Sequence, residues 1–219
     1  MYQAITEPRT PHPRDHFRMS SFGQCLRAQV AERAGLPILN PFDRRVAFKL
    51  WVGTVIHTAW QTELTKIGFL DPAWTEREVR YRSYVGHVDG LTHCLPGGDC
   101  LVECKTADDS AVTKPDWPAH YLWQDLLYCV AAGIPRCLIQ QLGKSQGLSR
   151  ERVLILTDEW RAKINMQMDM AEEAWAAYAG TGTLPVHGHQ FPWEDRTCPQ
   201  LSEDDKTLFH PMKKGVKRA

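Results

Sequence analysis

Two stretches of the chain have the pattern of β-strands joined by a tight turn. Residues 85–91 and 100–105 are rich in β-forming side chains, and the intervening Leu95–Pro–Gly–Gly–Asp99 has residues that reverse a chain. Side chains alternate between the two faces of a strand, so Leu101, Glu103 and Lys105 share one face. The pattern therefore predicts a β-hairpin with an acid and a lysine side by side.

Apolar residues recur at helical spacing in four other segments. Residues 22–35 form a predicted helix that Ser20 or Ser21 can cap and Gly35 ends. Further helices are expected over 44–68, over 119–132, and after a capping Asp158. Additional strands are predicted at residues 74–84, 136–142 and 150–157, and a mobile loop at residues 107–118.

Length and charge indicate one globular domain. The 219 residues suffice for a substantial core, and 26 basic residues balance 26 acidic ones, so no overall field draws the protein to polyanions. We expect a flexible lead-in at 1–18, a domain at 19–182, and a C-terminal extension with a basic tail at 183–219. No apolar run suits a signal peptide or a membrane span, which predicts a cytoplasmic protein without a membrane partner.

The predicted hairpin carries the strongest candidate chemistry. Asp89 precedes the turn at a spacing that can bring its carboxylate towards that of Glu103. Two close carboxylates repel each other, and a hard cation such as Mg²⁺ or Mn²⁺ between them relieves the repulsion. Lys105 would then orient a water or offset charge on a phosphate. The alternative is an exposed hairpin whose charged residues alternate without function.

Two predicted helices place further polar residues on shared faces. Gly53 and His57 are one turn apart, as are Gln124 and Tyr128. Gly53 leaves room for a close approach, so His57 can emerge at a crowded site. The alternatives are a boundary histidine on an apolar helix and a half-buried packing tyrosine.

Four motifs together resemble a known family. GTVIHTAW (53–60), VGHVDGL (85–91), LVECKTA (101–107) and QDLLYCVAAG (124–133) occur in the order found in the RecB-type branch of the PD-(D/E)XK nuclease superfamily. The chain is most similar there to CRISPR-associated and phage RecB-like exonucleases, over about residues 20–180. The resemblance implies an α/β (α+β) fold with a restriction-endonuclease-like core, in which helices flank a central mixed β-sheet.

The resemblance also implies roles for individual residues. His57, Asp89, Glu103 and the main-chain carbonyl of Cys104 would bind Mg²⁺ or Mn²⁺, and Lys105 would be the catalytic lysine. The residues expected to contact DNA are Gln124, Tyr128 and Arg27.

The implied activity is metal-dependent hydrolysis of DNA, as an exonuclease on ends or single strands in recombination, repair or phage DNA metabolism. A helicase, recombinase or integrase is the expected partner, in the cytoplasm of a bacterium or a phage-infected host. The alternatives are a structure-specific or restriction-type endonuclease, and a catalytically quiescent DNA-binding adaptor like those of CRISPR adaptation.

The cysteines depart from the family pattern. Relatives often hold an iron–sulfur cluster with one early and three late cysteines, whereas this chain has Cys25 early and only Cys198 late. We therefore expect no iron–sulfur cluster. Cys25, His187, His189 and Cys198 have the ligand types of a zinc site. Cys100 and Cys104 fall on the strand face opposite Glu103 and are expected to pack in the core.

Overall fold

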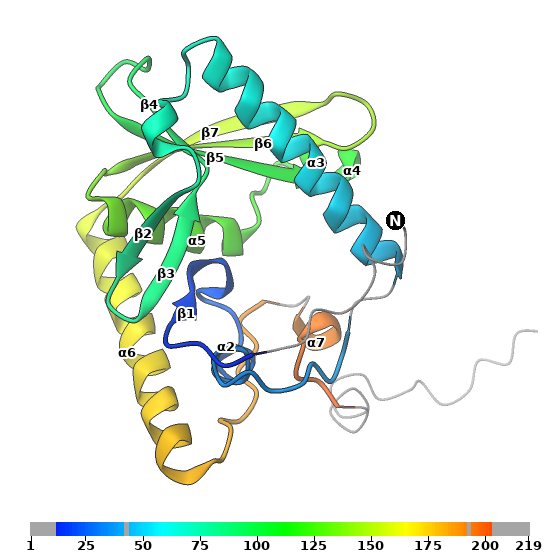
Figure 1. Cartoon of the computed structure of the whole chain (residues 1–219), viewed down its shortest axis with the longest axis vertical. Helices are drawn as coiled ribbons and strands as arrows, with labels where there is room; N and C mark the ends of the chain where they lie inside the picture. Colours follow the sequence, from blue (N-terminus) through cyan, green and yellow to red (C-terminus); the bar gives the residue numbers. More distant parts are fainter. Residues whose placement is uncertain (1–11, 42–43, 192–193, 203–219) are drawn as a thin grey trace, which may run out of the picture.

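The computed structural model describes residues 12–41, 44–191 and 194–202. Residues 1–11 of the predicted lead-in and the basic tail at 211–219 lie outside the described residues. The elements in chain order (Figure 1) are β1 (Phe17–Arg18), the 3-10 turn η1 (Met19–Ser21), α2 (Leu26–Arg33), α3 (Arg44–Lys66), the 3-10 turn η2 (Pro72–Trp74), β2 (Arg77–Tyr81), β3 (Tyr84–Val88), β4 (Gly90–Thr92), β5 (Cys100–Ala107), α4 (Asp109–Val112), α5 (Ala119–Ala132), β6 (Arg136–Gly143), β7 (Ser149–Ile155), α6 (Asp158–Thr181) and α7 (Glu194–Thr197).

Two mixed sheets make up the β structure. One has the order β1-β3-β2 and the other β4-β5-β6-β7, with β5 and β6 parallel. The predicted hairpin is confirmed, because β4 pairs antiparallel with β5 and places Gly90 opposite Val102. The predicted single strand at 85–91 is wrong in one respect: it breaks at Asp89, so its first part pairs with β2 in the other sheet.

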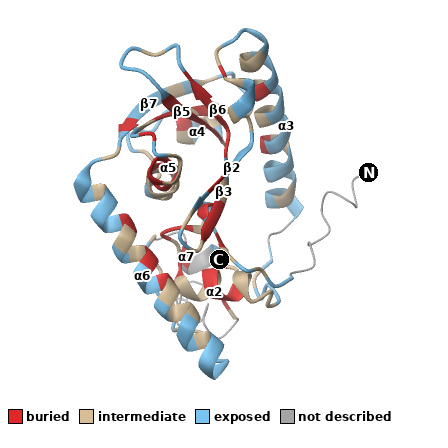
Figure 2. Ribbon diagram, turned by 60° about the vertical axis from the view of Figure 1, so that its left-hand side comes forward, coloured by how far each residue is buried: buried red, intermediate tan, exposed pale blue. Residues whose placement is uncertain are grey.

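The four-stranded sheet has a helix on each face. Leu101 of β5 packs in the main core with Leu126 and Leu127 of α5. Cys100 and Val102 point the other way, into a smaller cluster that includes Trp60 of α3. The predicted alternation along this strand is therefore confirmed. Figures 1 and 2 show α3 and α5 on opposite sides of the sheet, and most of the burial lies on strands and α5 rather than α3.

Several predicted boundaries are wrong at the N-terminal side. The helix expected from residue 22 begins at Leu26, because η1 precedes it and Gly23 has a φ of 75° that helical residues do not adopt. Cys25 is thus the residue before α2 rather than part of it. Residues 12–18 of the predicted lead-in include β1, which pairs with β3 and contains the buried Phe17.

The remaining differences are local. The stretch 74–84 contains η2 and a strand that starts only at Arg77, and the predicted loop at 107–118 contains the one-turn helix α4. Helix α6 is capped by Thr157, whose hydroxyl accepts from the Trp160 amide at 3.2 Å, rather than by Asp158. Helix α5 ends as predicted, because Gly133 adopts the left-handed conformation with φ 71°.

The predicted fold class is confirmed as a mixed α/β arrangement, with two sheets in place of the single central one. In the described part of the chain, no helix combines the length and apolar character that a membrane span needs.

Candidate active site

The centre of the candidate site is the inward face of β5. Glu103 and Lys105 alternate with Cys104 on this strand and are 2% and 9% exposed. Lys105 Nζ lies 3.0 Å from Glu103 Oε2 and 3.0 Å from Asp125 Oδ1. A buried ammonium therefore stands between two buried carboxylates, one from the strand and one from α5.

Asp89 is held against Glu103 by its position at the break between β3 and β4. The Asp89 amide donates to Glu103 Oε1 at 3.0 Å, and Asp89 Oδ2 accepts from the Cys104 amide at 2.7 Å. These reciprocal backbone bonds fix both carboxylates on the same side of the hairpin. The predicted convergence of the two acids and the lysine is present in the structure.

Helix α3 brings His57 to the same place. An added Cβ at Gly53 would lie only 2.5 Å from Thr106 Oγ1, so the glycine allows α3 to cross β5 closely. One turn later His57 Nε2 lies 3.0 Å from Asp89 Oδ2. Gln61 adds a third contact from the helix, because its Nε2 donates to the Asp89 carbonyl at 2.8 Å.

Helix α5 closes the other side of the site. Gln124 Oε1 accepts from Lys105 Nζ at 3.1 Å, and its Nε2 donates to the Tyr128 hydroxyl at 3.0 Å. Gly86 of β3 makes room for the tyrosine, since a Cβ there would lie 2.7 Å from Tyr128 Cε1. Two glycines of the sequence motifs thus serve the same purpose, which is close packing around the charged residues.

Burial and charge shift the protonation of this group strongly. Burial and then the Asp89 charge raise the pKa of Glu103 well above its usual value. Burial raises the pKa of Asp125 to about 6. Burial alone would lower the pKa of Lys105, but the charges of Asp125 and Glu103 outweigh it and raise the pKa. Strongly shifted pKa values gathered in one small site are typical of functional groups.

The donor set fits a divalent cation. Ligand atoms of His57, Glu76 and Asp89 lie within 4.8 Å of one another, and Glu103 adjoins Asp89. Burial would lower the pKa of His57, yet the hydrogen bond and charge of Asp89 raise it. Carboxylate oxygens with one imidazole are ligands that suit Mg²⁺ or Mn²⁺.

Two members of the site were not found from the sequence. Asp125 is fully buried within the apolar stretch of α5, and this unusual carboxylate was a signal that could have revealed it. Glu76 accepts a hydrogen bond from Gln61 at 3.0 Å, but it lies in an irregular turn with φ 53° and no pattern marks it.

Other predicted residues lie elsewhere. Arg27 of α2 donates to the Pro185 carbonyl at 3.1 Å and is not part of the group around Lys105. Cys25, His187, His189 and Cys198 come together at a separate place beside α2. Cys100 and Cys104 are buried, as predicted.

Comparison with known proteins finds similarity in the fold but not in the sequence. Its fold is similar to those of solved structures at TM-scores just above 0.5, although no family model and no curated protein sequence matches the chain.

Three of these structures, of two proteins, illustrate the similarity. The crystal structure of SSO0001 has a TM-score of 0.52 at 12% identity and covers 90% of this chain and 88% of its own. The alkaline exonuclease LHK-Exo from Laribacter hongkongensis has a TM-score of 0.51 at 11% identity, covering 76% of this chain and 90% of the exonuclease. LHK-Exo in complex with dAMP gives 0.52 at 14% identity, with 71% and 80% covered. At these identities the similarity shows the fold alone.

Proposed function

We propose that this protein is a metal-dependent deoxyribonuclease whose active site comprises His57, Asp89, Glu103 and Lys105. The observation that carries the proposal is the convergence of these four side chains from α3, the β3–β4 break and β5. The likeness of the fold to that of an alkaline exonuclease supports the same class of reaction.

The chemistry follows from the groups present. A divalent ion held by His57, Asp89, Glu103 and the Cys104 carbonyl would supply a Lewis acid for the phosphate and lower the pKa of a water. Lys105 remains an ammonium because its pKa is raised, so its charge can offset the negative charge that develops on the phosphate. Gln124 holds that ammonium by its amide oxygen, and Tyr128 in turn positions Gln124. Contact of Gln124 and Tyr128 with DNA is part of this proposal, and Gln124 is the more accessible of the two because Tyr128 is only 4% exposed.

The reaction proposed is hydrolysis of a phosphodiester. Water oxygen forms a bond to phosphorus, the bond from phosphorus to the 3′ oxygen breaks, and the released 3′ oxygen takes up a proton. The products carry a 5′-phosphate and a 3′-hydroxyl. We favour an exonuclease acting on ends or single strands in recombination, repair or phage DNA metabolism, together with a helicase, recombinase or integrase.

End-labelled linear DNA and covalently closed single-stranded DNA provide the test. Each is incubated with Mn²⁺ or Mg²⁺, with an EDTA control, and the products are followed by gel electrophoresis over time. Metal-dependent loss of the linear substrate alone would support the exonuclease, and labels at each end would reveal its polarity. Cutting of the circle would instead indicate an endonuclease.

Lys105→Ala and Asp89→Ala separate catalysis from binding. We expect each to lower the cleavage rate by at least about 100-fold, because each removes charge used in the transition state. Binding of DNA, measured by fluorescence anisotropy, should stay nearly unchanged. Near-normal cutting by either variant would contradict this site, whereas binding without cutting by the unmodified protein would favour a quiescent adaptor.

A further inference from the structure

Four metal-binding side chains meet on the far side of the molecule from β4. Cys25 precedes α2, His187 and His189 lie in the segment after α6, and Cys198 follows α7. Cys25 Sγ lies 3.6 Å and Cys198 Sγ 4.0 Å from His187 Nδ1, and the rings of the two histidines are 5.0 Å apart. One ligand atom from each of the four residues lies within 4.8 Å of the other three.

These separations suit one tetrahedral ion. Zinc binds sulfur at about 2.3 Å and nitrogen at about 2.0–2.1 Å, so a tetrahedral site has sulfur–nitrogen edges of about 3.5 Å. The two measured sulfur–nitrogen distances are near that value. A cluster of several irons would spread its ligands over different metal atoms and prefers four thiolates.

We propose that Cys25, His187, His189 and Cys198 form a structural zinc site that fastens the C-terminal segment to α2. Both cysteines are free and almost fully buried, at 0% and 1% exposed. Two thiolates balance the charge of Zn²⁺ and two imidazoles add none, so the buried assembly is neutral and avoids the cost of an isolated buried charge.

The segment that the zinc would hold lacks regular secondary structure and has only a small apolar cluster beside it. Residues 183–191 form neither helix nor strand, and the local apolar cluster consists of Cys25, Cys198 and Leu201 with Ala28 packed against it. A core of that size buries too little apolar area to order a loop of this length. A structural zinc ion held by these four residues would add its binding free energy to the stability of the segment.

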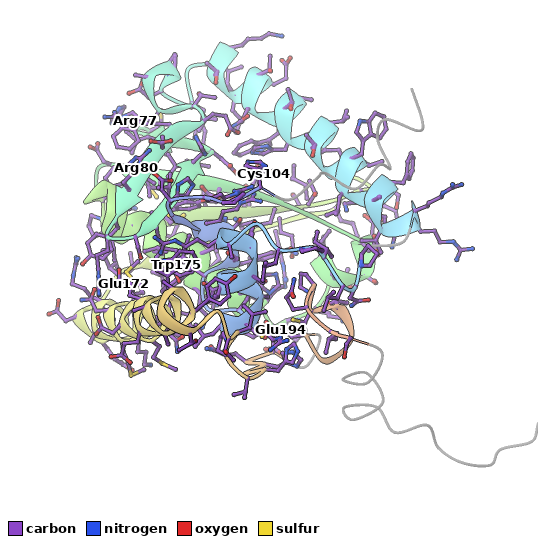
Figure 3. All side chains as sticks on the ribbon, turned by 60° about the horizontal axis from the view of Figure 1, so that its bottom comes forward. Arg77, Arg80, Cys104, Glu172, Trp175 and Glu194 are labelled. Atoms are coloured by element: carbon purple, nitrogen blue, oxygen red, sulfur yellow. The ribbon has the colours of Figure 1, made fainter. Side chains whose placement is uncertain are left out.

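Hydrogen bonds fix the backbone around the four proposed zinc ligands. The buried carboxylate of Glu194, labelled in Figure 3 beside α2, accepts from the amides of Cys25 at 2.6 Å, Gln190 at 2.8 Å and Phe191 at 2.9 Å. Asn40 Nδ2 donates to the Cys198 carbonyl at 3.2 Å. The backbone on both sides of the four ligands is therefore held before any metal arrives.

Metal content of the full chain tests the site independently of nuclease activity. The protein carrying Asp89→Asn, which weakens the catalytic metal site, is purified without chelator and analysed by plasma mass spectrometry. We expect about one zinc per chain. Adding Cys198→Ser or His189→Ala should reduce the zinc content to less than about a tenth of that value, since each removes a direct ligand. Cys94→Ser, at an exposed cysteine outside the site, is the matched control and should keep the zinc.

Two further measurements make the result decisive. Protein depleted of zinc and loaded with Co²⁺ should show thiolate-to-cobalt and visible bands of tetrahedral cobalt, and His189→Ala should lose them. Circular dichroism checks that the variants fold. Zinc retained by both ligand variants, a folded protein that neither contains nor takes up zinc, or iron with sulfide instead of zinc would each overturn the proposal. None of these results bears on whether His57, Asp89, Glu103 and Lys105 cleave DNA.

Discussion

Lys105 occupies an unusual position for a lysine, because it is buried between Glu103 and Asp125 with Gln124 as a third partner. Three neighbours restrict the ammonium to one location, and the two carboxylates keep it charged. In a site proposed to act on phosphate, a fixed cation stabilises the transition state more than a mobile one, since it need not reorganise during the reaction.

Asp125→Asn tests whether this positioning matters. The amide cannot provide the negative charge that raises the pKa of Lys105, so the ammonium should be held less firmly. We expect kcat for DNA cleavage to fall by about 10–100-fold, as for other outer partners of catalytic groups, with KM nearly unchanged. Asp116→Asn, at an exposed position, is the control, and equal kcat values for the two variants would refute a positioning role.

His120 provides a prediction about pH. Burial, and then the charge of Lys105, lowers its pKa to about 4. The unfolded chain, with a histidine pKa of about 6.5, takes up the proton first as pH falls, so this residue destabilises the fold between about pH 6.5 and about pH 4.

His120→Phe should remove that sensitivity while keeping a ring against Tyr121 and Phe191. Between about pH 7.5 and about pH 5 we expect the variant to lose roughly 1–2 kcal/mol less unfolding free energy than the unmodified protein. Urea unfolding at the two pH values measures the difference. Parallel losses in both proteins would show that another group is responsible.

At this scale the sequence predicts part of the site. Period-two alternation suffices to place Glu103 and Lys105 on one face, and helical spacing suffices for Gln124 and Tyr128. Arg27 was predicted to contact DNA, but its hydrogen bond to the Pro185 carbonyl, 158 residues away, could not be predicted because no local pattern encodes it.

Among the elements, the β3–β4 junction shows where pattern reading fails. Residues 85–91 form one β-rich run, and only the pairing of β3 with β2 and of β4 with β5 reveals a change of sheet at Asp89. Strand pairing is a long-range property, so the break could not be predicted locally. The late start of α2 has a similar origin, because Phe22 is buried and packs against Tyr84 and Trp123.

Gly86→Ala tests the packing of β3 against α5. The new methyl would press on Tyr128 and lie 2.9 Å from Met19 Cβ, and such overpacking costs about 1–3 kcal/mol. Gly180→Ala on α6 meets nothing within 4 Å and should stabilise the protein slightly through helix propensity. Thermal unfolding of the two variants should therefore shift in opposite directions, and a neutral Gly86→Ala would contradict the close packing.

For the molecule as a whole, binding of a metal ion at the candidate active site should raise the stability of the fold. Asp89 and Glu103 repel each other across the site, and a ligand that binds only the folded state stabilises it. With free Mn²⁺ at about 100 times its Kd, we expect Tm to rise by roughly 5–10 °C. Differential scanning calorimetry measures the shift. Asp89→Asn should show much less of it, and an equal shift in that variant would place the ion elsewhere.

Helix α3 supplies His57 although, of its 23 residues, only Gly53 and Gln61 are buried. Its N-terminal half exposes large apolar side chains (Figure 2), so the helix is attached mainly through its C-terminal half, by Gln61 at Asp89 and by Trp60 and Leu64 in the smaller cluster. Amide hydrogens of α3 should consequently exchange with solvent faster than those of β5 and β6, and slow down when Mn²⁺ is added. Binding of the ion then also has to order α3, which lowers the observed affinity for the ion. A partner that binds and orders α3 could therefore change the rate of cleavage without contacting the catalytic residues.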